Sequence, residues 1–195
     1  MYPTPGTAVD LVLMVFRLTI AVVLLAHGWN HIFGGGRIAG TARWFESLGM
    51  RPGIVHAWAA SATELGAGVL VGLGLLTPLG AAAVVGVMIV ALVTAHLRNG
   101  FFIFRPGQGY EYVVVLIMCA VAIGVVGPGR WSADYALGIS WPDWVRFAVT
   151  AGAGLGGGAV QLAAFWRPAR AQTPAPPTPA PAVATAAESQ SASAE

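Results

Sequence analysis

The stretch "VDLVLMVFRLTIAVVLLAHGWNHIF", residues 9–33, decides the fold class of this chain. A helix that crosses the hydrocarbon core of a bilayer needs roughly 20 mainly apolar residues. The stretch meets this requirement, although it contains Arg17 and ends in polar residues ahead of three glycines, 34–36. The sequence therefore predicts a transmembrane helix with a basic residue inside it and a polar end.

The whole chain has the composition of an integral membrane protein. Of its 195 residues 56% are hydrophobic and only 9% are charged, whereas a soluble domain carries about 25% charged residues. The mean hydropathy is +0.72. No run of basic residues favours nucleic-acid binding. Cys119 is the only cysteine, which excludes an internal disulfide and a C-x-x-C dithiol mechanism within one chain.

Four more segments are candidates for membrane spans. Three of them have the length and apolar character of the first: 55–76, 79–97 and 110–127. Thr77 and Pro78 separate the first two, which predicts a tight helical hairpin. The last segment, 147–166, holds five glycines, which weaken a helix in water and are commoner in membrane helices. The predicted fold is all-α: a membrane bundle of four core transmembrane helices plus a fifth.

The rest of the chain divides into short segments. We expect an N-terminal segment 1–8, a membrane core 9–127, a loop and the fifth span 128–166, and a Pro/Ala-rich tail 167–195. The tail cannot bury enough apolar surface to fold alone, so it is expected to be disordered. In the loop 34–54, apolar residues recur at helical spacing at Ile38, Ala42 and Phe45, which predicts a short helix lying in the membrane interface.

Three spacings of small residues predict close contacts between helices. They are Gly68-x3-Gly72, Ala82-x3-Gly86 and Ala120-x3-Gly124. Small side chains let helix backbones approach each other in a membrane. The spacings support a compact bundle and indicate no function.

The distribution of arginine predicts the orientation in the membrane. Cytoplasmic loops carry an excess of basic residues. The loops 34–54 and 98–109 together hold five arginines, whereas the opposite side holds only Arg130 and Arg146. We therefore expect both loops in the cytoplasm and the N-terminus outside. The tail lies inside if the fifth helix spans, and outside if it does not.

Arg17 and Glu64 lie inside predicted spans, where a charge costs roughly 2.5–3.5 kcal/mol. At about 1.5 Å of rise per residue their depths in the bilayer differ by only a few Å. An Arg17–Glu64 ion pair is therefore geometrically reachable. Such a pair either locks the packing of the helices or binds or protonates a polar head group. The third interpretation is that Arg17 extends toward the outer surface.

Polar residues converge near the predicted inner ends of the helices. His27 and His31 are four residues apart and share a helix face. The candidate pocket consists of Arg17, His27, Asn30, His31, Glu64, His96 and Glu111. Imidazole and carboxylate groups suit zinc, iron and manganese, but we favour a quinone or another small amphiphile over a metal or haem. Structural roles, such as interfacial positions and helix-dipole pairing, would explain the same residues.

Four stretches carry a resemblance to a known family. They are "FRLTIAVVLLAHGWNHIFGG" (16–35), "ARWFESLGMRPG" (42–53), "TELGAGVLVGLGLLTPLGA" (63–81) and "AHLRNGFFIFRPGQGYEY" (95–112). Over residues 9–127 the chain resembles the DoxX family of small bacterial membrane proteins. The resemblance implies a four-helix core in the bacterial cell membrane. The motif positions that it carries over are Arg17, Gly28, Glu64, His96, Asn99, Gly100 and Glu111. It also implies lysine in many relatives where this chain has His31, which argues against a metal ligand there.

The resemblance implies a redox role. Relatives are linked to thiosulfate oxidation coupled to quinone, and to membrane assemblies with superoxide-detoxifying and sulfur-transferring enzymes. In the first hypothesis the chain is a membrane component of such a system, with a quinone or small molecule in the pocket. Glu64 and Glu111 would handle protons, and Arg17, His31 and His96 would stabilise negative charge.

Two other hypotheses stay open. A non-catalytic membrane anchor or assembly factor would bind soluble oxidoreductases at the cytoplasmic face through 37–51, 98–108 and the tail. A small transporter would explain ionisable groups near the middle of the membrane. The chain carries no nucleotide or flavin motif, so as an enzyme it would be a quinone-linked oxidoreductase subunit. The sequence leaves the substrate and the oligomeric state open.

Overall fold

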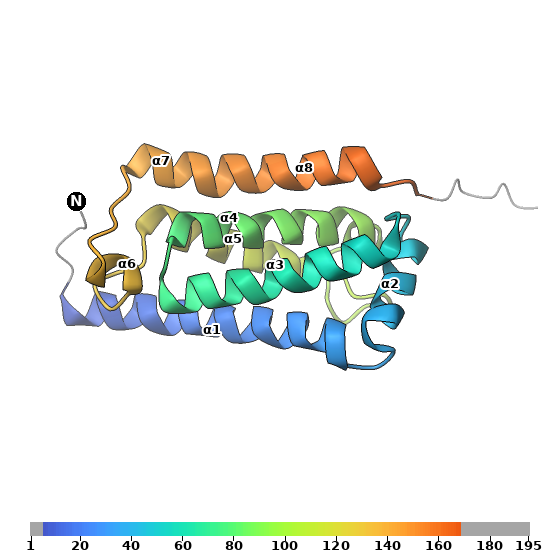
Figure 1. The fold of residues 1–195 in the computed structure, drawn as a ribbon, viewed down its shortest axis with the longest axis horizontal. Coiled ribbons are helices and arrows are strands. Elements are labelled where there is room, and N and C mark those ends of the chain that lie inside the picture. The colour runs from blue at the N-terminus through green and yellow to red at the C-terminus, as the bar shows by residue number, and fades with distance from the viewer. Residues whose placement is uncertain (1–5, 169–195) are drawn as a thin grey trace, which may run out of the picture.

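The protein is a bundle of apolar helices that run along one long axis (Figure 1). The computed structural model describes residues 6–168. In chain order the elements are α1 (Thr7–Phe33), α2 (Arg37–Ser47), α3 (Gly53–Leu73), α4 (Thr77–Ala91), η1 (Leu92–His96), η2 (Leu97–Asn99), α5 (Glu111–Val126), α6 (Ala133–Ala136), α7 (Asp143–Phe147), η3 (Ala148–Ala153) and α8 (Gly154–Phe165). Residues 6–168 contain no strand, only an isolated bridge between Met50 and Trp166. The predicted all-α membrane bundle is confirmed.

All five predicted spans are helical, but their lengths differ from expectation. Four helical runs are long and apolar enough to cross a membrane: Thr7–Phe33, Gly53–Leu73, Thr77–Asn99 and Asp143–Phe165. The last of these joins α7, η3 and α8, so the glycine-rich segment is one of the long helices. In contrast α5 has 16 residues, which is about 24 Å of helix. The chain is a multi-pass membrane protein.

The prediction of a disordered tail falls on residues 167–195, of which only 167 and 168 are described. Most of that prediction lies outside the described residues. Of the predicted N-terminal segment 1–8, residues 1–5 also lie outside them. The remainder differs from expectation, because α1 already begins at Thr7.

Helices α1 and α3 pack closely because glycines lie at their contact. A Cβ at Gly68 would lie 2.9 Å from Leu25 Cγ, and one at Gly28 would lie 2.8 Å from Leu65 Cγ. Neither position has room for a larger side chain. The contact fixes the register of α1 against α3, so that Gly28 lies opposite Ser61 and Leu65.

Helix α8 packs along α4 through a second set of glycines (Figure 1). A Cβ at Gly154 would lie 2.7 Å from Val85 Cβ, and one at Gly158 would lie 3.0 Å from Ile89 Cγ2. On the facing helix a Cβ at Gly86 would lie 3.3 Å from the Gly154 carbonyl oxygen. The small-residue spacing that ends at Gly86 is therefore a contact site for α8, as its composition predicted.

Polar contacts close one end of the bundle, which we call the α6 end. The buried Asp134 carboxylate accepts hydrogen bonds from the Leu76 and Thr77 amides at 2.7 and 3.0 Å, and from the Thr77 hydroxyl. Asp10, also buried, accepts from the amide and the guanidinium of Arg130 at 2.9 and 2.7 Å. The loop that carries α6 is thereby tied both to the α3–α4 turn and to α1.

The opposite end, which we call the α2 end, is closed by α2 and the segment after it (Figure 1). The Thr41 hydroxyl on α2 donates to the His31 carbonyl at 2.8 Å. The Trp166 indole donates to the Leu48 carbonyl at 3.0 Å, and the Arg167 amide donates to Gly49 at 2.8 Å. The end of α8 is thus joined to the loop that follows α2, so α8 is an integral part of the bundle.

Candidate functional site

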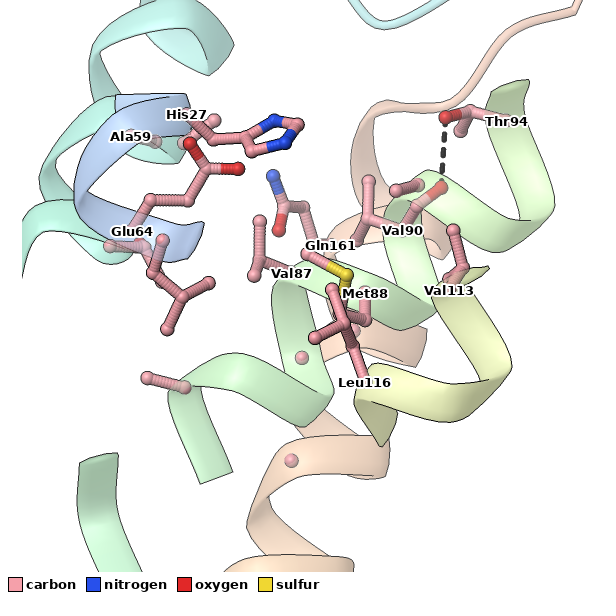
Figure 2. A pocket seen from close by; sticks show the side chains of 18 of the residues that line it. His27, Ala59, Glu64, Val87, Met88, Val90, Thr94, Val113, Leu116 and Gln161 are labelled. Atoms are coloured by element: carbon pink, nitrogen blue, oxygen red, sulfur yellow. Dashed lines mark hydrogen bonds between the residues drawn. The ribbon is translucent and has the colours of Figure 1, made fainter. Parts of the chain in front are cut away.

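A cavity of about 630 Å³ lies between the helices. Helices α1, α3, α4, α5 and α8 supply most of its walls, with further residues from α2, η1, η3 and the loop before α5. Figure 2 shows the His27 ring, the Glu64 carboxyl and the Gln161 amide pointing into the same space. The cavity therefore has a polar side to which three different helices contribute.

Glu64 is the buried carboxyl group of this polar side. The residue is only 5% exposed, and its Oε2 atom lies 3.7 Å from Nε2 of His31. This separation is too long for a hydrogen bond. Glu64 Oε2 and His31 Nδ1 are both buried without a hydrogen-bond partner. Buried polar atoms in native proteins are normally partnered, so this pair has unused hydrogen-bonding capacity facing a cavity.

Two more histidines contribute polar atoms, one inside the cavity and one behind its wall. His96 lines the cavity, and its Nδ1 atom lies 2.9 Å from the Gln108 carbonyl. His56 is almost fully buried and its Nδ1 atom lies 3.2 Å from Nε2 of Gln161, which lines the cavity. The Nε2 atom of His56 has no partner.

The remaining walls are apolar or small. Between α3, α4 and α8 the cavity is lined by Ala59, Ala60, Thr63, Ala82, Ala83, Gly86, Ala153, Gly154, Gly157 and Gly158. On the other side larger apolar residues from α1 and α5, such as Leu24 and Leu116, complete it. The cavity is therefore amphipathic, with one carboxyl–imidazole group and a long apolar surface.

A family comparison covers the segment from α1 to η1. Residues 12–97 match the family model described as DoxX. This part of the chain is similar to the DoxX family. The predicted resemblance is confirmed, although the match ends at residue 97 whereas the resemblance was expected to reach 127. No curated protein and no solved structure matches the chain.

The DoxX match contains Glu64, both histidines of α1 and His96, and all four residues line the cavity. Helix α5 and the run from α7 to α8 lie beyond the match, yet they supply Leu116, Gly157 and Gln161 to the same cavity. The cavity of this chain is thus built jointly by the DoxX segment and by helices that follow it.

Arg17 does not lie beside Glu64, so the expected ion pair between them is wrong. The Arg17 guanidinium donates to the carbonyls of Trp131 at 2.6 Å and Gly72 at 3.5 Å. The register of α1 against α3 explains the difference, because it places Glu64 near His31. Arg17 is 14 residues before His31, about 21 Å along the helix. Arg17 therefore belongs to the α6 end.

Asn30 and Glu111 also lie outside the cavity lining. Asn30 is exposed near the end of α1. Glu111 accepts a hydrogen bond from the Ile103 amide at 3.3 Å. It acts together with Asn99, whose side chain donates to the carbonyls of Gly107 and Gln108 at 2.6 and 3.2 Å. These residues hold the loop before α5, which closes the cavity at the α2 end.

Two further motif residues have local structural reasons. Gly100 has φ +79°, a conformation that favours glycine, and its carbonyl accepts from the Tyr110 amide at 3.0 Å. Gly28 is required by the contact with Leu65 described above. Within residues 6–168 no group of three or more His, Cys, Asp or Glu side chains is arranged to hold a metal ion.

Sequence reasoning missed Gln161, His56 and Asp134. Gln161 is a single polar residue in an otherwise apolar, glycine-rich helix. A polar residue inside a membrane span indicates a candidate functional site, so the sequence did contain a signal for Gln161. His56 lies near the start of α3, a position at which the sequence alone suggests a residue of the membrane interface. Asp134 lies in the short helix α6, and only the three-dimensional structure brings it to the start of α4.

Proposed function

We propose that this protein is a membrane component of a redox or oxidative-stress system, and that its cavity binds a quinone or a similar small amphiphile. The single observation that carries the proposal is the Glu64–His31 pair in the wall of a 630 Å³ amphipathic cavity. The Oε2 atom of Glu64 and the Nδ1 atom of His31 have no hydrogen-bond partner. Ligand pockets are typically apolar clefts of about 300–1,000 Å³ with a few converging polar groups. The cavity has both properties.

The polar side fits the chemistry of a quinone head group. Quinone oxygens accept hydrogen bonds, and imidazole and carboxylic acid groups can donate them. Reduction to the hydroquinone takes two electrons and two protons. In this proposal His31 and Glu64 exchange protons with the ring oxygens. A soluble oxidoreductase partner would supply or accept the electrons, so this chain is proposed as a subunit and not as a complete enzyme.

The orientation that we propose follows from the two ends of the bundle. Arginines of the α2 end include Arg37, Arg43, Arg51 and Arg98. At the α6 end Arg130 is paired with Asp10. An excess of positive charge marks the cytoplasmic side. We propose that the α2 end faces the cytoplasm of a bacterial cell and that α1 begins outside.

Titration of the purified protein with menadione, a quinone without a long chain, tests the proposal. The readout is quenching of tryptophan fluorescence, since Trp44 lines the cavity. We expect saturable quenching in the wild type. Glu64→Gln should raise the Kd several-fold and at most about tenfold, because it replaces the carboxylic acid donor by a weaker amide donor and a neutral hydrogen bond contributes about 0.5–1.5 kcal/mol.

Glu46→Gln is the matched control. It makes the same isosteric change on the exposed surface of α2, outside the cavity lining. Its Kd should equal that of the wild type. Quenching that does not saturate, or an equal Kd in the Glu64 and Glu46 variants, would contradict the proposal.

A second candidate function is that of a docking platform for soluble oxidoreductases. The observation that favours it is the exposed aromatic loop Phe101–Phe104, in which Phe104 is 79% exposed. Arg105 lies over the Phe102 ring at 5.7 Å. Phe104→Ser should then remove co-purification of a defined oxidoreductase and leave menadione binding unchanged. Unchanged co-purification would contradict this second function.

A further inference from the structure

A crevice between α3 and α8 is bridged only near the α2 end in the described contacts. There His56 contacts Gln161 at 3.2 Å, and the rings of His56 and Phe165 lie 5.0 Å apart. Ala60 and Thr63 follow His56 by four and seven residues, and Gly157 precedes Gln161 by four. Each set therefore shares one helix face. Away from the bridge, the side chains that face the crevice are too small to fill it.

The environment of the glycines on α8 shows where the crevice is open. Gly154 and Gly158 are buried on α4, where a Cβ would lie 2.7 and 3.0 Å from neighbouring side chains. Gly157 differs from both. It lines the cavity and is exposed, and a Cβ there would meet nothing within 4 Å. Helix α8 thus rests on α4 while leaving free space at Gly157.

This opening lies at the height of Glu64 along the bundle. The α3–α4 hairpin brings Gly80 against Leu70, since a Cβ at Gly80 would lie 2.9 Å from Leu70 Cβ. Glu64 and Gly86 are each six residues from that contact, about 9 Å along antiparallel helices. Gly86 in turn faces Gly154 and Gly158. The crevice therefore opens near the middle of α3, where lipid chains surround the protein.

The carboxyl group beside this opening is available to a ligand. Glu64 lines the same cavity, is about 95% buried, and its Oε2 atom has no hydrogen-bond partner. We propose that the α3–α8 crevice holds the long apolar tail of an amphiphile whose head group lies at Glu64, and that the ligand enters sideways from the lipid. This inference rests on the proposed function and narrows its ligand to molecules with a long chain.

The test compares two quinones in nanodiscs that contain the full protein. One is menadione and the other is menaquinone with a four-unit isoprenoid chain, which has the same head group. We expect the wild type to bind the long-chain quinone more tightly. Gly157→Leu should reduce this preference about tenfold, which is about 1.4 kcal/mol, because the leucine side chain would occupy the space of the isoprenoid chain. Menadione has no chain to occupy the space at Gly157, so it should lose less affinity than the long-chain quinone.

Gly156→Leu is the matched control. Gly156 is adjacent, equally exposed and equally free of neighbours within 4 Å, but it does not line the cavity. Its preference for the long chain should equal that of the wild type, which also removes partition of the quinone into lipid as an explanation. If Gly157→Leu does not fold, Ala153→Leu against Gly152→Leu provides a second pair, since only Ala153 lines the cavity.

The outcomes separate this inference from the proposed function. Equal preference in the Gly156 and Gly157 variants, with Glu64-dependent menadione binding intact, would overturn the tail site alone. The same holds if the wild type shows no preference for the long chain. Absence of any quinone binding to the folded wild type would overturn both proposals.

Discussion

Buried polar residues of this protein divide into those that are satisfied by the fold and those that are left open. Asp134 and Asp10 accept several hydrogen bonds from neighbouring segments. Arg17 is 1% exposed and donates to two carbonyls, although its Nε atom has no hydrogen-bond partner. Glu64 and His31 keep unpartnered atoms and, unlike Arg17, line the cavity. The proposed function therefore gives the ligand to Glu64 and His31, and gives Arg17, Asp10 and Asp134 a part in stability.

Arg17→Gln should lower stability without changing the ligand site. The variant removes two hydrogen bonds to buried carbonyls and a positive charge that interacts with Asp134. We expect a loss of about 3 kcal/mol, measured as a lower unfolding temperature in detergent. Arg43→Gln, a change of an exposed arginine on α2, should leave it unchanged. A stable Arg17 variant that fails to bind quinone would show that Arg17 belongs to the site after all.

The sequence alone predicted that Arg17 and Glu64 are unusual, but not which residue each one meets. The free-energy cost of burying a charged side chain can be estimated from the sequence of one helix. The residue that the side chain contacts depends on the register between two helices. That register is set by Gly28 and Gly68, and a shift of about four turns of α1 along α3 would be needed to bring Arg17 to Glu64. The histidines His27, His31 and His96 could be grouped from the topology alone, because they lie toward the same ends of their helices, whereas the place of Glu64, near the middle of α3, needed the register.

Helix α8 shows most clearly how the role of glycines depends on the neighbouring helix. Its glycines seemed to weaken the prediction of a span, yet two of them are the contact surface for α4. A third leaves the crevice open, and Gln161 reaches the cavity. Helix periodicity identified the segment, but glycines on different faces of one helix can be distinguished only when the neighbouring helix is known.

Gly154→Leu should displace α8 from α4. A larger side chain would overlap Val85, so the helices must separate and the Gln161–His56 contact should be lost. The expected cost is about 1–3 kcal/mol, seen as a lower unfolding temperature and as faster proteolysis between α7 and the end of the chain. Gly152→Leu, where a Cβ meets nothing within 4 Å, is the control. Equal stability of the two variants would argue against packing of α8 on α4.

At the scale of the whole molecule, the described chain begins at one end of the bundle and finishes at the other (Figure 1). Helices α1 and α8 both finish at the α2 end, where the arginine-rich segments also lie. Composition predicted this asymmetry because basic residues concentrate in two loops. It left open whether the fifth segment crosses, and the 23-residue run Asp143–Phe165 is long and apolar enough to do so.

Single cysteines should report this orientation in intact bacterial cells, in a Cys119→Ala background. Ser140→Cys, in the loop between α6 and α7, should react with a membrane-impermeant maleimide. Ser47→Cys, at the end of α2, should react only after the membrane is permeabilised. Both positions are exposed, so lack of access to the protein surface does not explain a difference. The reverse pattern would invert the proposed topology, and labelling of both would contradict it.

The central claim is that Glu64 and its surroundings hold a quinone-like amphiphile in the membrane. The most direct measurement is solvent extraction of the protein purified from bacterial membranes, with quantification of quinone per protein. We predict near-stoichiometric quinone in the wild type and in Glu46→Gln, and a strong reduction in Glu64→Gln. A folded wild-type protein that carries no more quinone than an unrelated membrane protein from the same membranes would contradict the claim.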